Sequence, residues 1–257
     1  MPPLSLDYGN LPSHVAVIMD GNGRWARSHG LPRLQGHTKG VETVDEITRT
    51  AVELGIDTLT LYAFSSENWK RPREEVSGLM GLLKKYLESE LSTMLDNNIR
   101  LRCIGDIKKL PSDVQDSINY TLSQTSANNG LILNLALNYG GRDEIIRATR
   151  QLVDLCLQQK LQPQEIDKEL FNRKLDTAEL SDPDLIIRTG GEKRLSNFLL
   201  WQASYSELYF TEINWPSFSR DDFIAALSDY QKRQRRFGKT GEQAPGRNNR
   251  ERSDNTG

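Results

Sequence analysis

Short apolar segments rich in β-branched residues alternate with amphipathic helical segments along most of this chain. Strands are predicted at 14–19, 58–64, 99–104, 131–137, 184–187 and 207–210. Helices are predicted at 39–54, 74–98, 114–122, 142–158, 195–205 and 221–236, with a short helix after Pro163. Such alternation predicts an α/β fold with a central, mostly parallel six-stranded sheet covered by helices. Ligands of such folds collect at the carboxyl ends of the strands.

Composition limits the classes of protein to which this chain can belong. Its 257 residues allow one large α/β domain or two small ones, and no linker or internal repeat divides them. A net charge of -2 does not indicate a protein that binds nucleic acid in bulk. Two cysteines imply neither a disulfide framework nor a zinc site. We find no signal peptide and no apolar run of membrane-spanning length, so we expect a cytoplasmic protein.

The first predicted strand ends at a single carboxylate, Asp20, which is followed by Gly21, Asn22, Gly23 and Arg24. Glycines let backbone N–H groups turn inward and cradle an anion. A carboxylate beside such a cradle needs a cation between itself and the anion, so we interpret Asp20 as a Mg²⁺-linked residue facing a diphosphate. The alternative is a plain turn in which the aspartate caps the next element.

The same letters also fit a dinucleotide fingerprint, Gly21-x-Gly23-x-x-Ala26. That interpretation needs a helix that begins inside the motif and continues, and glycine and proline at 30, 32 and 36 interrupt any such helix. The bulky Arg24 and Trp25 also stand where a pyrophosphate should approach bare backbone. The nucleotide interpretation is therefore weak.

Basic residues gather near the predicted strand ends and are candidates for holding a polyanion: Arg24, Arg33, His37, Arg71, Arg188 and Arg194. Each alone is more typical of a solvated surface charge, although the arginine fork matches phosphate oxygens bidentately. Arg188 stands between an apolar strand and a double glycine, an awkward place for an unpartnered charge. Two groups of arginines, one N-terminal and one near residue 190, suggest two anionic ligands side by side.

Other features allow two interpretations each. Glu207 opens an aromatic strand and is either a second metal carboxylate or a solvent-facing acid. The rings of Trp25, Phe64, Trp69 and Trp201 are core by default, but a wall of such rings also stabilises a carbocation. The leucine-rich helix at 74–98 either packs in the core or lines an apolar tunnel.

Four motifs together resemble the cis-prenyltransferases of the undecaprenyl diphosphate synthase family. They are the stretch at 14–26, Arg33-x-x-Gly36-His37, LYAFSSENWKRP at 61–72, and the long segment at 184–210. The likeness spans about residues 13–238, which would form the catalytic domain between a loose lead-in at 1–12 and a disordered polar tail at 239–257. Trans-type prenyltransferases are helical and carry Asp-Asp-x-x-Asp motifs, which this chain lacks.

The resemblance implies an enzyme with a hydrophobic tunnel that condenses isopentenyl diphosphate sequentially onto an allylic diphosphate such as farnesyl diphosphate, with cis geometry. Asp20 would be catalytic and, with Glu207, would bind the Mg²⁺ cofactor. Asn68 matches the position of the proton acceptor, although an amide is a poor base and the released diphosphate or a water is the alternative. The implied substrate-binding residues are Gly21, Asn22, Gly23, Arg24, Trp25, Arg33, His37, Ser65, Ser66, Glu67, Trp69, Arg71, Arg188, Arg194, Leu195 and Ser196.

Members of this family are homodimers, and Arg236-Phe237-Gly238 matches a C-terminal pattern that reaches the partner's active site. The resemblance favours undecaprenyl diphosphate, a cell-wall lipid carrier, as the product, with transient membrane contact for its release. Two other classes stay open: a nucleotide-dependent transferase, and a non-catalytic partner subunit. Subunits of the latter kind lose the strand-end aspartate and its neighbours, whereas Asp20, Arg24, Asn68 and Glu207 are all present here.

Overall fold

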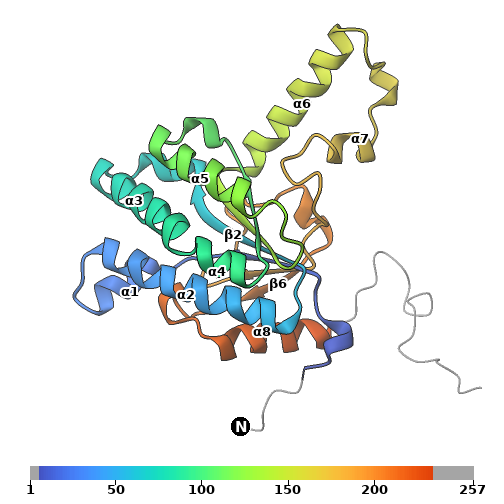
Figure 1. Cartoon of the computed structure of the whole chain (residues 1–257). Helices are drawn as coiled ribbons and strands as arrows, with labels where there is room; N and C mark the ends of the chain where they lie inside the picture. The colour runs from blue at the N-terminus through green and yellow to red at the C-terminus, as the bar shows by residue number, and fades with distance from the viewer. Residues whose placement is uncertain (1–5, 234–257) are drawn as a thin grey trace, which may run out of the picture.

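The computed structural model describes residues 6–233, and a six-stranded sheet runs through its centre (Figure 1). The strands are β1 His14–Ile18, β2 Thr58–Ser65, β3 Arg100–Ile104, β4 Ile132–Tyr139, β5 Leu185–Arg188 and β6 Glu207–Phe210. Their order is β3-β4-β2-β1-β5-β6, and every neighbouring pair is parallel. The predicted α/β class, the six strands and the parallel sheet are confirmed.

Helices follow most strands, as the alternating sequence pattern predicts. The α-helices are α1 Asn22–Ser28, α2 Arg33–Leu54, α3 Arg73–Ser89, α4 Leu91–Asp96, α5 Ser112–Gln124, α6 Gly141–Leu157, α7 Lys168–Asn172 and α8 Arg220–Lys232. Short 3-10 helices are η1 Tyr8–Asn10, η2 Ser66–Lys70, η3 Ile107–Lys109, η4 Pro163–Glu165, η5 Gln202–Tyr205 and η6 Trp215–Ser217. None of the helices at 6–233 is long and apolar enough to cross a bilayer.

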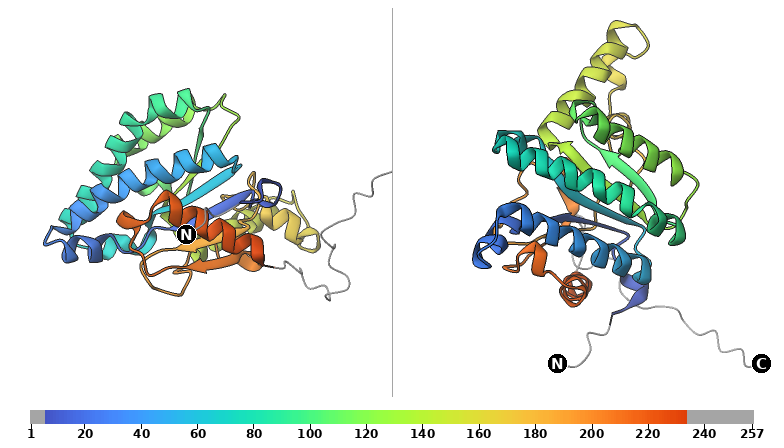
Figure 2. Two further views of the ribbon diagram at one scale, coloured as in Figure 1. Left: turned by 90° about the horizontal axis from the view of Figure 1, so that it is seen from below. Right: turned by 60° about the vertical axis from the view of Figure 1, so that its left-hand side comes forward.

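The two faces of the sheet are covered differently. Val15 and Val17 of β1 point into the larger core, which packs against α2, α3, α5 and α8, whereas Ala16 and Ile18 point into a smaller core with Phe198. This alternation follows from the two-residue period of a strand. Figure 2 shows α2, α3 and α8 together on one side of the sheet, and α6 projecting away from it.

The segment between β1 and α2 differs from the prediction. A loop was expected up to residue 39, but α1 begins at Asn22 and α2 already begins at Arg33. Pro32 stands just before the first turn of α2, where a missing N–H costs nothing. Gly36 lies inside α2 because α1 crosses it there: an added Cβ would stand 2.1 Å from the backbone oxygen of Asn22. Glycine here permits helix packing rather than ending a helix.

Two other predicted helices are also corrected. The helix expected at 74–98 is divided at Glu90 into α3 and α4. The segment at 195–205 is mostly turns, with only η5 at its end, and Ser196, Asn197 and Leu199 have positive φ angles. Asn197 explains this shape, because its backbone and side-chain oxygens accept hydrogen bonds from the N-terminal N–H groups of α6. Those contacts replace the bonds of a regular helix.

The chain ends were also predicted from sequence. Residues 6–12, expected to be part of a loose lead-in, are held to α8 because Gln231 donates to the backbone oxygens of Asp7 and Asn10. The end of the helix predicted at 221–236, the Arg236-Phe237-Gly238 motif and the tail at 239–257 lie outside the described residues. Those predictions therefore stay predictions.

Candidate active site

The candidate site lies where the sheet order changes direction, between the carboxyl ends of β1 and β5. β1 pairs with β2 on one side and with β5 on the other, which brings Asp20 and Thr189 together. The backbone N–H of Asp20 donates to Thr189 Oγ1 at 3.0 Å, and that hydroxyl donates to the Asp20 backbone oxygen at 2.7 Å. Such switch points form ligand-binding crevices in open α/β sheets.

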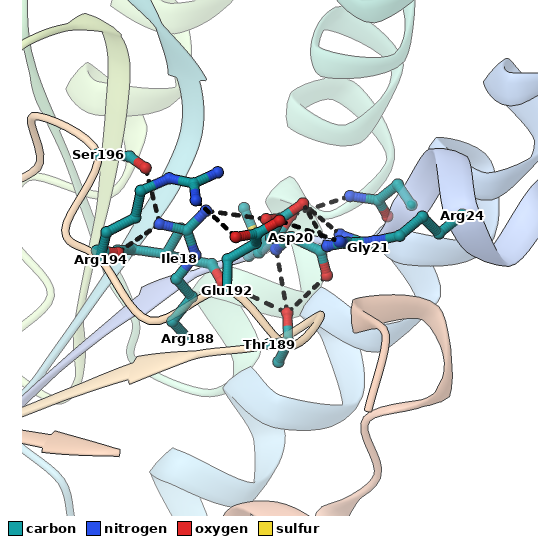
Figure 3. A network of polar contacts seen from close by, with 11 residues as sticks. Ile18, Asp20, Gly21, Arg24, Arg188, Thr189, Glu192, Arg194 and Ser196 are labelled. Carbon is teal, nitrogen blue, oxygen red and sulfur yellow. Dashed lines mark hydrogen bonds and ion pairs between the residues drawn. The ribbon is translucent and has the colours of Figure 1, made fainter. Parts of the chain in front are cut away.

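Asp20 is the central carboxylate of this crevice (Figure 3). Its Oδ2 lies 2.9 Å from Nη2 of Arg188, and its Oδ1 lies 3.2 Å from Nη2 of Arg24. Arg188 is only 4% exposed and also donates to Ser196 Oγ at 2.7 Å and to the backbone oxygen of Arg194. A buried guanidinium needs such partners, since an unpaired buried charge is costly.

A second carboxylate, Glu192, joins two of the predicted anion-binding arginines. Its Oε1 lies 3.6 Å from Nη1 of Arg24, and its Oε2 lies 2.5 Å from Nη1 of Arg194. The backbone bends sharply here: Gly190 has a φ of 81°, and a Cβ on it would stand 2.5 Å from Arg24 Nη2. Glycine at 190 therefore lets the loop after β5 approach the arginine of α1.

The other basic residues converge on Glu75 of α3. Its Oε1 lies 3.0 Å from Arg71 Nη1, 3.5 Å from Arg33 Nη2 and 3.8 Å from His37 Nε2. Burial, followed by the charges of Arg71 and Arg33, lowers the pKa of His37 to about 4, against the opposing effect of Glu75. His37 is therefore neutral near pH 7.

A cavity of about 340 Å³ connects two groups of basic residues to the protein interior: Arg188 beside Asp20, and the residues Arg33, His37 and Arg71 around Glu75. Its polar end includes Asp20, Arg33, His37, Asn68, Arg71, Arg188 and Ser196. Its other walls come from α2, α3, β2 and β4 and are apolar: Val41, Val44, Leu61, Leu79, Met80, Leu82, Leu83, Leu135 and Leu137. The arrangement suits a molecule with an anionic head and a hydrocarbon tail.

The chemistry of the donor set is compatible with Mg²⁺. Magnesium is commonly held by one or two carboxylates together with substrate phosphates, rather than by an all-protein cage. Asp20 supplies a carboxylate beside the anion-binding backbone, and its side chain is 33% exposed. Within residues 6–233, no three His, Cys, Asp or Glu side chains form a cluster that could hold a metal by themselves. Asp20 therefore fits a shared site that a diphosphate would complete.

Comparison with known proteins places this geometry in a family. The family model described as "Putative undecaprenyl diphosphate synthase" matches residues 18–238. The chain is 51% identical over 232 residues to an isoprenyl transferase of Oceanobacillus iheyensis, covering 90% of this chain and 92% of that relative. It is 53% identical over 229 residues to an isoprenyl transferase of Rhizobium meliloti, covering 89% and 93%. The chain belongs to this prenyltransferase family.

Solved structures agree with that assignment. Lavandulyl diphosphate synthase from Lavandula x intermedia, crystallised with dimethylallyl diphosphate, superposes with a TM-score of 0.87 at 39% identity, covering 89% of this chain and 99% of that one. A probable undecaprenyl diphosphate synthase from Campylobacter jejuni gives a TM-score of 0.75 at 39% identity, covering 90% and 100%. The resemblance inferred from sequence motifs is thus confirmed at the level of family and fold.

Some of the residues that the family resemblance implied as substrate ligands lie outside the cavity. Trp25 stacks on His29 with ring centroids 4.1 Å apart, and Leu195 packs in the smaller core. Ser66 Oγ donates to Asp143, and Glu67 accepts from Asn197, so both hold the segments around the cavity together. Trp69 donates to Asn138 Oδ1 at 2.8 Å and packs edge-on against Phe64. Their roles as substrate ligands stay predictions.

Glu207 also lies apart from Asp20 within one chain. It begins β6 and is in register with Leu185, at the amino end of β5, whereas Asp20 follows the carboxyl end of β1. Its carboxylate accepts from Arg233 Nη1 at 2.9 Å. Glu207 therefore lies at the amino end of its strand, and its metal role stays a prediction that would require a second subunit.

Three polar residues of the site were not identified from the sequence: Thr189, Glu75 and Glu192. Glu75 follows Arg71 by four residues on a helix, a spacing that brings opposite charges together and that gave a detectable signal. Glu192 follows the double glycine directly and was detectable only by its proximity to that turn. Trp215, which donates to the Gly40 oxygen and lines the cavity, had no sequence signal.

Proposed function

We propose that this chain condenses isopentenyl diphosphate sequentially onto an allylic diphosphate, with farnesyl diphosphate as the starter and undecaprenyl diphosphate as the product, and with cis geometry at each new double bond. Family membership supports prenyl transfer. The observation that carries the finer proposal is the continuity of the cavity, because two basic groups at its polar end open directly into an apolar compartment.

The two basic groups divide the two diphosphates between them. We assign the allylic diphosphate to the backbone at Gly21 and Gly23 with Arg33 and His37, which lie beside the N-terminus of α1. We assign isopentenyl diphosphate to Arg188 and its neighbours Arg194 and Ser196, which form a connected set. Holding both substrates side by side converts a bimolecular reaction into a positioned one.

Departure of the allylic diphosphate is the step that the charged residues assist. Negative charge gathers on the leaving oxygens as the C–O bond breaks, and fixed arginines and backbone N–H groups stabilise it. Bound to Asp20, Mg²⁺ would supply further charge neutralisation for the diphosphate. In this chain, Asp20 now pairs with Arg188 and Arg24, so substrate binding must rearrange these ion pairs.

The proton released after C–C bond formation needs an acceptor near the isopentenyl group. Asn68 lines the cavity, and its Oδ1 already accepts the backbone N–H of Ser65 at 3.1 Å. That bond fixes the amide at the end of β2. We therefore assign Asn68 to orienting the substrate and a proton-accepting water or diphosphate oxygen, rather than to acting as a strong base.

We infer that the enzyme works as a homodimer in the cytoplasm, with transient membrane contact for product release. One face of α6 supports the dimer: Ile146, Val153 and Leu157 are exposed at helical spacing on a helix that projects from the sheet. A second copy of the chain would cover this face. It would also offer a route by which Glu207, or Arg236-Phe237-Gly238, reaches the site of a partner subunit.

The test is to incubate the purified protein with farnesyl diphosphate and radiolabelled isopentenyl diphosphate, with Mg²⁺ or with EDTA, and to size the products. We expect labelled polyprenyl diphosphates with Mg²⁺ and none with EDTA. Arg188→Ala should lose incorporation, whereas Lys39→Ala, which removes an exposed cation of α2 paired with Glu42, should retain it. Absence of labelled product with every allylic starter would refute the proposal, as would thermal stabilisation by nucleotides but not by diphosphates.

A further inference from the structure

The segment that follows the double glycine after β5 holds the buried guanidinium of Arg188 in place. Nη1 of Arg188 donates to Ser196 Oγ at 2.7 Å and to the backbone oxygen of Arg194, as Figure 3 shows. Its Nη2 donates to Asp20, and within residues 6–233 its Nε has no hydrogen-bond partner. Substrate binding rearranges the ion pairs of Asp20 in the proposed function. The guanidinium then depends on Ser196 and Arg194 for its orientation.

The backbone of this segment has an unusual shape. Ser196 has a φ of 49° and Asn197 has a φ of 63°, so both lie in the left-handed region. Residues other than glycine rarely adopt this region, although asparagine does so more readily than most. Surrounding contacts must therefore hold the two residues in this shape. A return to the usual backbone region would turn the Ser196 hydroxyl away from Arg188.

Asn197 makes three contacts that hold the segment, and they reach two different elements. Its backbone oxygen accepts from the N–H of Gly141 at 2.7 Å, and its Oδ1 accepts from the N–H of Arg142 at 2.9 Å. Both N–H groups belong to the first turn of α6, where a helix has no internal acceptors for them. The Nδ2 of Asn197 donates to Glu67 Oε1 at 2.8 Å. One side chain thus uses its acceptor on α6 and its donor on η2.

Glycines after β4 make room for this contact. A Cβ on Gly140 would stand 2.7 Å from Nδ2 of Asn197, and a Cβ on Gly141 would stand 3.2 Å from its backbone oxygen. Such distances are too short for a side chain, so glycine at both positions lets Asn197 approach the start of α6. The half-buried amide is therefore closely enclosed by the end of β4.

The contact with Glu67 joins the segment to a second part of the candidate site. Glu67 lies in η2 next to Asn68, which lines the cavity. Burial raises the pKa of Glu67, but hydrogen bonds, the largest of them from Asn197, lower it below its usual value overall. The carboxylate is therefore ionised at neutral pH and can only accept hydrogen bonds. This requires the amide nitrogen of Asn197 to face Glu67 and its oxygen to face α6.

We propose that Asn197 is a positioning residue for isopentenyl diphosphate, which aligns Ser196 with Arg188 and ties both to η2, where Asn68 lies. This inference rests on the proposed function. Asn197 acts on the substrate through Ser196, its neighbour in the chain. The groups assigned to the allylic diphosphate lie elsewhere, at the start of α1 and on α2. Loss of the Asn197 side chain should therefore weaken the binding of one substrate and not of the other.

The first experiment measures the two substrates separately. The KM for isopentenyl diphosphate is measured with saturating farnesyl diphosphate, and the Kd of farnesyl diphosphate is measured by calorimetry without isopentenyl diphosphate. In Asn197→Ala this KM should rise about tenfold, the scale of one lost hydrogen bond, with a smaller change in kcat. The Kd of farnesyl diphosphate should stay at its wild-type value. The matched control Asn97→Ala removes an amide that donates to the Thr93 backbone oxygen at the end of α4, and it should change neither constant.

Isosteric variants distinguish positioning from stability. Asn197→Asp keeps the oxygen that accepts from α6, and a carboxylate is favoured at a helix N-terminus, so the Tm should stay close to that of wild type. The same change sets two carboxylates against each other at Glu67, so the KM for isopentenyl diphosphate should rise. Adding Glu67→Gln restores a donor and an acceptor in exchanged positions. The KM of this double variant should return toward that of Glu67→Gln alone, which a merely structural role at constant Tm would not produce.

The outcomes separate the positioning role from the proposed function. If Asn197→Ala does not fold, Asn197→Asp and its combination with Glu67→Gln carry the same test. The positioning role is overturned if the KM for isopentenyl diphosphate is unchanged in the Asn197 variants, if it rises together with the Kd of farnesyl diphosphate, or if the effects of the double variant simply add. In each of these cases wild-type protein still converts isopentenyl diphosphate, so the proposed function stands. Wild-type protein that converts none with any allylic starter would overturn both.

Discussion

Replacement of Asp20 by alanine should destabilise the protein as well as stop turnover. The side chain of Arg188 is 5% exposed and lies 2.9 Å from Asp20, so the variant leaves a buried cation without its carboxylate. Breaking a buried pair costs about 3–5 kcal/mol. Arg188 keeps Ser196 and the Arg194 oxygen, and Asp20 is one-third exposed, so we expect a loss of about 2 kcal/mol here.

Calorimetric or fluorescence melting measures this loss. For a chain of this size, about 2 kcal/mol corresponds to a fall in Tm of about 4–8 °C. Inorganic pyrophosphate in Mg²⁺-free buffer should raise the Tm of Asp20→Ala more than that of wild type, because the anion replaces the missing carboxylate at Arg188. The Tm of Asp20→Asn should fall less than that of Asp20→Ala, since the amide oxygen of the asparagine can still accept a hydrogen bond from Arg188.

The matched control is Glu192→Ala, which removes a carboxylate whose arginine partners are exposed. Exposed ion pairs contribute about 0–1 kcal/mol, so its Tm should change little. The reasoning is refuted if Asp20→Ala melts like wild type in the absence of ligand, or if pyrophosphate stabilises both proteins equally.

Three further predictions follow from burial and packing. A bound diphosphate should raise the low pKa of His37, so that diphosphate binding takes up a proton and weakens as the pH rises. Calorimetry in buffers of different ionisation enthalpy should detect this proton uptake. The variant His37→Gln should abolish the proton uptake. Because the pKa of Asp45 is raised to about 6 in the folded protein, its contribution to stability falls as the pH rises from about 4 through 6. Urea titrations across that pH range should therefore show the free energy of unfolding of Asp45→Asn rising relative to that of wild type, by up to about 1 kcal/mol after allowance for partial exposure. Gly36→Ala should destabilise the protein by about 2 kcal/mol or more, since the added Cβ would clash with the backbone oxygen of Asn22. Gly81→Ala should stabilise α3 by about 0.5–1 kcal/mol, because its added Cβ meets nothing within 4 Å. Comparing the melting curves of the two variants distinguishes packing from helix propensity.

The fold was predictable because each buried strand carries its own apolar signal. Strand ends rich in glycine and polar residues then located the crevice, and Asp20 and Arg188 were found in this way. What sequence could not supply was tertiary contact. Gly36 resembles a helix breaker until α1 is seen to cross it, and Asn197 redirects an apolar stretch because it binds the start of α6.

The position of Glu207 shows a different limit. Its strand was predicted to begin at this residue, and the parallel pairing of β6 with β5 places it at the amino end, away from Asp20. A metal role for it depends on a second copy of the chain, and no local pattern encodes contacts between copies. Glu75 was missed because a charge four residues from an arginine is usually an ordinary surface pair. Only the arrival of Arg33 and His37 from another helix makes it the centre of a basic group.

The parallel arrangement of α2 and α3 has a consequence for how relatives of this enzyme could diverge. Near its start each helix carries a residue of the polar end, His37 on α2 and Glu75 on α3, and three turns later it carries a member of the neighbouring pair Thr48 and Tyr86. One extra turn in both helices would deepen the compartment by about 5.4 Å and keep both ends in register. One extra turn in a single helix would separate Thr48 from Tyr86, so a deeper compartment requires coordinated insertions in both helices.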